Sequence, residues 1–157
     1  MPSYGDVPFD LIEEGKEKLL LLESLEERRE KIRDLLAGEG YHVLVPAGEE
    51  AALEKFRFQE CSVILAGERS RPEGAGTPSV LDYIRRIPSG ERRRFFVVLL
   101  SETLPTMDSM AAFRQSVNLV VNYENLDQLP GILRRAQVAH DEHYAVLRES
   151  LRRAGRI

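Results

Sequence analysis

The stretch CSVILAGE, residues 61–68, decides which fold this chain adopts. It is a short apolar run of the kind found in strands that are buried on both faces of a parallel sheet. The run stops at Ala66 and Gly67, and neither residue can accept a proton, attack a substrate or hold a metal ion. In an open α/β sheet, the carboxyl ends of the strands normally carry the functional groups. The sequence therefore predicts a central strand whose functional end has lost its chemistry.

Apolar runs alternate with amphipathic segments on both sides of this stretch. We expect strands in five segments: KLLLLES from residue 18, HVLVPAG from 42, CSVIL from 61, RFFVVLL from 94 and NLVV from 118. We expect helices in five further segments: 25–41, 49–58, 80–87, 106–116 and about 125–155. Such regular alternation, joined by short loops, predicts one parallel sheet with helices on both faces.

The periodicity of the helical segments also predicts which side chains face the core. In the first helix, one face carries apolar residues and the rest is charged, with the apolar set Leu25, Ile32, Leu35 and Leu36. In the fourth helix, Met110 and Phe113 are expected to point into the interior, because a short helix needs apolar residues for its own packing. Pro130 is expected in the first turn of the last helix, where a missing N–H is tolerated.

Composition limits the class of protein. The chain has 157 residues, 43% hydrophobic and 31% charged, which suits one compact globular domain. It has no apolar stretch long enough for a membrane span, and its acidic start does not suit a secretory signal. The single cysteine, Cys61, excludes an internal disulfide and a cysteine-based zinc site, and it fits a reducing cytoplasmic location.

The charge distribution gives no argument for nucleic acid as a partner. The formal net charge is −4, and the densest basic cluster is Arg92–Arg94, directly before a predicted strand. We interpret this cluster as a solvated loop that keeps the strand end soluble.

The order of the elements resembles the receiver domain of bacterial two-component response regulators. The resemblance rests on the whole β-α alternation, with AGEGYHV leading into the second strand and NLVVNYENLDQLPGIL leading into the last helix. It implies a flavodoxin-like three-layer α/β/α sandwich with a five-stranded parallel sheet in the order 2-1-3-4-5 and an extended C-terminal helix. It also divides the chain into an N-terminal extension (1–17), a receiver-like domain (18–138) and an extension of the fifth helix (139–157).

The resemblance further implies where a receiver's phosphorylation site falls. A receiver uses an acidic pair for Mg²⁺, an acceptor aspartate, a Ser or Thr hydroxyl and a lysine that is usually followed by proline. The corresponding residues in this chain are Glu23 and Ser24 for the acidic pair, Ala66 for the acceptor, Ser101 for the hydroxyl, Asn122 for the lysine and Tyr123 for the proline. Most of the motif is therefore broken.

The broken motif removes the chemistry of a receiver. A methyl group at position 66 cannot form an acyl phosphate, which requires a carboxylate nucleophile. Mg²⁺ prefers a cage of hard oxygen ligands with one or two carboxylates, and Asn122 supplies no positive charge. Glu68 is expected to lie too far along the loop to substitute. The sequence thus predicts a degenerate pseudo-receiver that is not an enzyme and has no metal or other cofactor.

The last helix carries an apolar stripe that continues past the expected domain. The residues of the stripe recur at spacings of three, four or seven, namely Leu129, Leu133, Ala136, His140, Tyr144, Leu147 and Leu151. If the helix is straight, the fifteen residues beyond 138 extend it by roughly 22 Å, away from its own sheet. We expect these residues to meet a protein partner or a second copy, with a homodimer favoured.

In receivers, the face formed by the fourth helix, fifth strand and fifth helix typically transmits the signal. The resemblance therefore implies an interaction surface on this side of the domain, and we expect it to include Tyr123, His140, Tyr144, Leu147 and Leu151. Tyr123 is expected to be exposed there. His140 and His143 share a helical face, but two ligands alone make a poor metal site.

Two other functions remain open from the sequence. One is a small-ligand- or nucleotide-binding domain that uses the degenerate pocket, although ESLEERRE after the first strand is acidic and lacks a phosphate cradle. The other is a receiver that is phosphorylated by an irregular route. The leading interpretation is a non-enzymatic, cytoplasmic signalling module that works by protein–protein contact.

Overall fold

The computed structural model describes residues 17–46, 51–54, 61–68 and 80–155, and everything reported below concerns these residues. Five strands form one sheet: β1 (Glu17–Leu22), β2 (Tyr41–Leu44), β3 (Val63–Gly67), β4 (Phe96–Ser101) and β5 (Leu119–Asn122). Neighbouring strands all pair in parallel, in the order β2-β1-β3-β4-β5. The predicted flavodoxin-like order is therefore confirmed.

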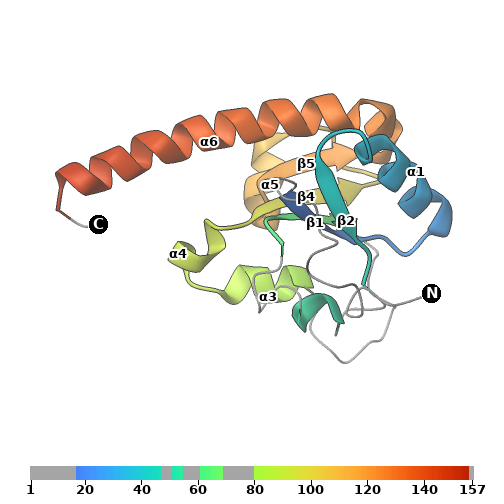
Figure 1. The fold of residues 1–157 in the computed structure, drawn as a ribbon, viewed down its shortest axis with the longest axis horizontal. Helices are drawn as coiled ribbons and strands as arrows, with labels where there is room; N and C mark the ends of the chain where they lie inside the picture. The colour runs from blue at the N-terminus through green and yellow to red at the C-terminus, as the bar shows by residue number, and fades with distance from the viewer. Residues whose placement is uncertain (1–16, 47–50, 55–60, 69–79, 156–157) are drawn as a thin grey trace.

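The helices follow the strands in the expected alternation, as Figure 1 shows. They are α1 (Glu26–Leu36), α3 (Val80–Arg86), α4 (Ser89–Arg92), α5 (Ser109–Gln115), the 3₁₀ helix η3 (Tyr123–Gln128) and α6 (Leu129–Arg153). Residues 51–54 are helical as well, and the rest of the helix predicted over 49–58 lies outside the described residues. Of the N-terminal extension predicted over 1–17, only Glu17 is described, and it begins β1.

Alternating side chains of the strands build a core on each face of the sheet. Leu19 and Leu21 of β1 pack with α1 and α6 on one face, and Leu20 and Leu22 pack with α3 and α5 on the other. All four leucines are buried, as expected for a strand covered on both sides. The two cores explain the three-layer α/β/α arrangement.

Three side chains expected in the core are exposed instead. Leu25 precedes α1 and is 51% exposed, while Met110 and Phe113 of α5 are 59% and 80% exposed. The predictions for these residues were wrong. Leu25 lies just before α1 and not on its buried face, and α5 approaches the sheet through the small side chains of Ala111 and Ala112. A helix that packs through alanine turns its larger apolar residues outward.

The basic cluster before β4 is also different from the prediction. Arg92 ends the short helix α4, and its guanidinium donates hydrogen bonds to the carbonyl oxygen of Phe95 and to Asn118 Oδ1, both at 2.7 Å. Asn118 Oδ1 also accepts from the backbone N–H of Val97 at 2.8 Å. Burial lowers the pKa of Arg92 from its ordinary value. Arg92 is therefore a structural clamp between α4 and β5, rather than part of a solvated loop.

The last helix is the longest element of the described chain, at 25 residues. Pro130 lies in its first turn, as expected, and its first part buries Leu129, Ile132 and Leu133 against the sheet. Figure 1 shows that α6 then continues well past the edge of the sheet. Among the described residues, no helix combines the length and apolar character that a bilayer crossing needs.

The doubly covered sheet makes a direct prediction for stability. Leu65 of β3 is fully buried, so Leu65→Ala is expected to lower the free energy of unfolding by about 2–5 kcal/mol. The matched control is Leu25→Ala, the same chemical change at a residue that is 51% exposed, which is expected to cost less than about 0.5 kcal/mol. Urea unfolding measures both changes, and equal losses would contradict the assignment of β3 as the central strand.

Candidate functional site

The carboxyl ends of β1, β3 and β4 meet at one edge of the sheet, where the predicted site lies. Glu23 directly follows β1, and it is 6% exposed; Ser101 ends β4 and is fully buried. Ala66 is fully buried too, but it belongs to the core on the α3 and α5 side, with Leu22 and Leu99 as its partners in the sheet register. Ala66 therefore fills space in the core.

The remaining two predicted residues of the site are engaged elsewhere or exposed. Ser24 is exposed. Asn122 ends β5, and its side-chain amide donates to the carbonyl oxygen of Leu104 at 3.0 Å while its Oδ1 accepts from the N–H of Glu124 at 2.9 Å. The Asn122 side chain thus caps η3 and ties it to the loop before α5.

A hydrogen bond between Tyr123 and Glu23 dominates the site. The Tyr123 hydroxyl donates to Glu23 Oε2 at 2.5 Å, across 100 residues of chain, and Glu23 Oε1 accepts from the N–H of Leu25 at 3.3 Å. Tyr123 is half-buried and points into the site, so the prediction of an exposed role was wrong. The resemblance to receivers implied only that a tyrosine stands where a proline is usual, and no local pattern indicates which direction its side chain faces.

Gly67 provides the space in which this hydrogen bond forms. A Cβ atom at position 67 would lie 2.7 Å from the Tyr123 hydroxyl oxygen and 2.8 Å from Glu23 Oε2. Both distances are shorter than any normal contact of a Cβ atom. The glycine that ends β3 is therefore required by the Tyr123–Glu23 pair, and its lack of a side chain has a structural reason.

Arg28 covers the pair from α1. Its guanidinium carbon lies 3.6 Å from the centre of the Tyr123 ring, and its Nη1 is 3.2 Å from Glu102 Oε1. A cation over an aromatic face is attracted by the negative charge density of the ring. The neighbouring Arg29 donates to the carbonyl oxygen of Glu23 at 3.2 Å, which fixes the chain where β1 turns into α1.

Glu68 closes the network on the far side, in a place where the sequence did not predict it. Its Oε2 accepts from the Ser101 hydroxyl at 2.9 Å, and its Oε1 accepts from the N–H of Glu102 at 2.8 Å. The expectation that Glu68 lies too far along the loop was wrong. Its own N–H bonds to the carbonyl oxygen of Leu100 at 3.0 Å, so the strand pairing continues one residue past β3 and holds Glu68 at the edge.

Together these contacts link five segments without any added group. The chain of contacts runs through Glu23, Tyr123, Arg28, Glu102, Glu68 and Ser101. Burial, reinforced by the bond to Glu23, raises the pKa of the Tyr123 phenol well above its ordinary value, so this group remains a hydrogen-bond donor. No group of three or more acidic, histidine or cysteine side chains in the described part of the chain could hold a metal ion.

The predicted interaction residues of α6 lie on one face, away from this network. His140 contacts the Phe96 ring edge-on, with 5.3 Å between ring centres, and it stacks on Tyr144 at 6.4 Å. Burial lowers the pKa of His140. Tyr144, Leu147 and Leu151 follow along the same face and are partly exposed.

A pocket of about 340 Å³ lies between α5 and α6. Its walls include Met107, Asp108, Ala112, Ala139, His140 and His143. Met107 is 55% exposed, and the exposed Met110 and Phe113 of α5 follow it three and six residues along the chain. This side of the domain therefore combines an apolar surface with a hollow, in contrast to the closed network at the strand ends.

The hydrogen bond across the site predicts a coupled loss of stability. Tyr123→Phe removes the donor and leaves a buried carboxylate with one partner fewer, so the free energy of unfolding is expected to fall by about 1–3 kcal/mol. The same change in a Glu23→Ala background is expected to cost much less. Tyr144→Phe is the control, with an expected loss below about 0.5 kcal/mol. Equal costs in both backgrounds, measured by urea unfolding, would show that the two side chains are not coupled.

The buried tyrosines predict a loss of stability in alkali. The folded pKa of Tyr123 is raised above its unfolded value, and burial raises the pKa of Tyr41 to about 12. The stabilisation of the folded state that comes from these raised pKa values is complete below about pH 10, the pKa of an unfolded tyrosine. It is lost as the pH rises above that value. Each tyrosine then lowers the free energy of unfolding by up to about 1.4 kcal/mol per pH unit. Urea unfolding from pH 9 upward tests this: the fall should be less steep in Tyr123→Phe, and an unchanged slope would contradict the burial of its phenol.

Comparison with known proteins bears on the fold. No protein-family model and no curated protein matches the chain. Among solved structures, the signal receiver domain of a putative LuxO repressor protein from Vibrio parahaemolyticus is 13% identical, with a TM-score of 0.63, over 83% of this chain and 97% of that chain. The signal receiver domain of an HD domain-containing protein from Pseudomonas fluorescens Pf-5 is 17% identical, with a TM-score of 0.60, over 81% and 98%. An orphan response regulator of H. pylori is 15% identical, with a TM-score of 0.58, over 78% and 97%. The chain therefore has the fold of a response-regulator receiver domain.

Proposed function

We propose that this chain is a receiver-like signalling module that acts through protein–protein contacts and is not controlled by phosphorylation. The observation that carries the proposal is the closed network at the carboxyl edge of the sheet, in which Tyr123 bonds the buried Glu23. A receiver needs that edge open for Mg²⁺ and a phosphoryl group. Here the chain's own side chains occupy it.

The charge and the hydrogen bonding of the side chains around the end of β3 both support the proposed loss of phosphorylation. Ala66 offers no nucleophile, and the nearby carboxylates of Glu23 and Glu68 already accept hydrogen bonds. A carboxylate whose oxygens are bonded is a weaker nucleophile and a poorer metal ligand. Phosphoryl transfer depends on positive charge around the moving group, whereas this network holds three carboxylates against the guanidinium of Arg28. We therefore propose a non-enzymatic role.

The apolar side of the domain supports a role in protein contact. Met107, just before α5, and Met110 and Phe113 on α5 follow one another at intervals of three residues, and each is more than half exposed. Methionine and aromatic residues are enriched in the centres of protein interfaces, and an exposed group of them commonly marks a binding surface. The adjoining pocket between α5 and α6 gives that surface a shape that an apolar side chain of a partner can enter.

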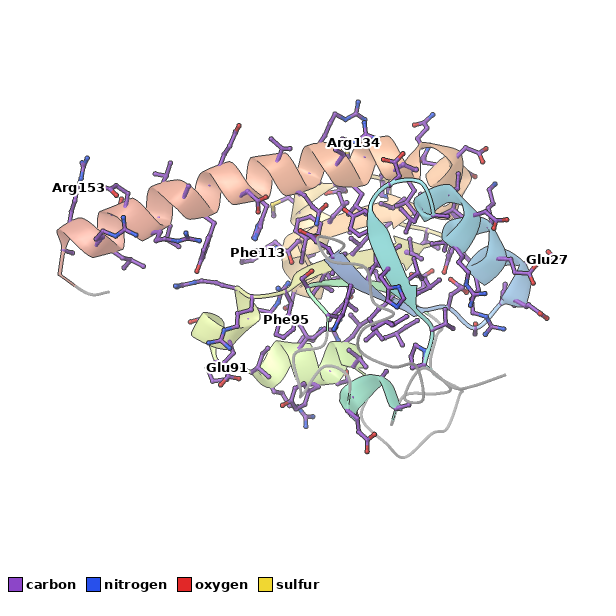
Figure 2. All side chains as sticks on the ribbon, in the orientation of Figure 1. Glu27, Glu91, Phe95, Phe113, Arg134 and Arg153 are labelled. Atoms are coloured by element: carbon purple, nitrogen blue, oxygen red, sulfur yellow. The ribbon has the colours of Figure 1, made fainter. Side chains whose placement is uncertain are left out.

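The projecting part of α6 supports a second contact, with a homodimer as its simplest form. Figure 2 shows side chains projecting from α6 as far as Arg153, at the opposite end of the molecule from Glu27 on α1. Tyr144, Leu147 and Leu151 continue the stripe of Leu133 and His140 along α6, and Figure 1 shows that this helix runs past the edge of the sheet. The single buried cysteine suits the proposed cytoplasmic setting.

The phosphorylation part of this proposal has a direct test. The full chain is incubated with a small acyl-phosphate donor and Mg²⁺, and intact mass spectrometry is expected to show no addition of about 80 Da, the mass of one phosphoryl group. A receiver domain that retains its aspartate serves as the positive control. An adduct that maps to Glu23 or Glu68 would overturn the proposal and favour phosphorylation by an irregular route.

A further inference from the structure

We propose that two copies of this chain pair through the projecting part of α6 in antiparallel orientation. This inference rests on the proposed self-association and adds the partner, the direction and the residues that set it. It comes from the positions of two oppositely charged side chains beside the apolar stripe of α6.

The stripe has the spacing of a helix that pairs with another helix. Its positions alternate by four and three residues, in the order Leu133, Gln137, His140, Tyr144, Leu147 and Leu151. That is the seven-residue pattern in which every first and fourth position faces a partner helix. Leu133 is fully buried in the domain core, and His140 packs on Phe96 but is only half-buried. Tyr144, Leu147, Leu151 and the exposed part of His140 are therefore left for a partner.

The two sides of the apolar stripe carry different polar side chains. On a helix that turns 100° per residue, Asp141 and Arg148 fall on one side of the stripe, and His143 and Ser150 fall on the other. Asp141 and Arg148 are both exposed, and neither forms an ion pair with another described residue. The Arg148 guanidinium carbon lies 4.7 Å from the centre of the Tyr144 ring, at the margin of the stripe.

Whether the two α6 helices run parallel or antiparallel decides which of these side chains face one another. In an antiparallel pair, each side of the stripe faces the same side of the second copy with the chain order reversed. Asp141 then faces Arg148 of the second copy, and Arg148 faces its Asp141, which gives two equivalent ion pairs. Tyr144 lies opposite the second copy's Leu147, and Leu151 lies opposite its His140. In a parallel pair, Arg148 instead faces His143 of the second copy, and Asp141 loses its cationic partner.

This self-complementarity is the reason to name a second copy as the partner. A two-fold axis brings the same patch of both copies together, so a patch that matches itself when reversed is suited to a symmetric dimer. The two helices overlap from about His140 to Leu151, and the two domains lie at opposite ends of the pair. Such a contact is expected to lie near the lower limit for a specific interface, about 1,000 Å² in total.

Charge reversal tests the direction by sedimentation equilibrium of the full chain. Asp141→Arg and Arg148→Asp each place like charges opposite one another, and each is expected to weaken dimerisation by about tenfold. The double variant exchanges the charges and is expected to return to within about threefold of the unchanged chain. Glu142→Arg is the matched control: it makes the same change of charge on the opposite face of α6 and is expected to have no effect.

Cysteine cross-linking in a Cys61→Ala background gives an independent readout. Leu151→Cys is expected to form no disulfide dimer alone, but to form one when mixed with His140→Cys. If Leu151→Cys cross-links to itself and the charge exchange has no effect, the dimer is parallel and this inference is overturned while self-association stands. If the unchanged chain is a monomer at the highest loading concentration, both the antiparallel pair and the proposed homodimer are overturned.

Discussion

The buried carboxylate of Glu23 imposes the constraint on which this molecule depends. At 6% exposure, its oxygens cannot rely on water, and a buried carboxylate without partners is costly. The Tyr123 hydroxyl and the N–H of Leu25 supply those partners from η3 and from the start of α1. Gly67 leaves the room for the bond, and Arg28 covers it. One acidic side chain thereby links the ends of β1 and β5 across the end of β3.

The partnering of Glu23 also affects the position of α6. Tyr123 begins η3, and η3 leads directly into α6, so the bond to Glu23 fixes the base of that helix. A second contact fixes it further along: the Tyr41 hydroxyl donates to Gln137 Oε1, and Gln137 Nε2 lies 3.4 Å from Glu17 Oε2. Polar contacts at the carboxyl ends and at the amino ends of the strands therefore add to the apolar packing that fixes the direction in which α6 leaves the domain. A rigid exit is what a helix needs if it is to present one face to a partner.

The sequence predicted the frame of this fold well, because the frame depends on local periodicity. Continuous apolar runs identified the five strands, and the long stripe identified α6. The contacts of the candidate site were harder to predict, because they join residues far apart in the chain. Tyr123 and Glu23 are 100 residues apart, and Glu68 reaches Ser101 across 33 residues. Side-chain direction at the end of a strand depends on these tertiary contacts, which no local pattern contains.

The two errors on α5 have a related cause. Met110 and Phe113 look like core residues because they are large and apolar, yet the close approach of Ala111 and Ala112 to the sheet leaves no room for them inside. Helix-to-sheet distance decides which face is buried, and a sequence of seven helical residues does not reveal that distance. The result is an apolar surface next to the pocket at α6, on the side where contact with a partner is proposed.

We propose that side chains of the chain itself occupy the place where a receiver domain is phosphorylated. The most direct measurement is an NMR titration of backbone amide shifts with Mg²⁺, followed by beryllium fluoride, a mimic of the phosphoryl group. The account predicts that the amides of Gly67, Glu68 and Glu102 do not move beyond the general effect of ionic strength. Saturable shifts at these amides, with release of Tyr123 from Glu23, would show that the site still opens to ligands and would contradict the account.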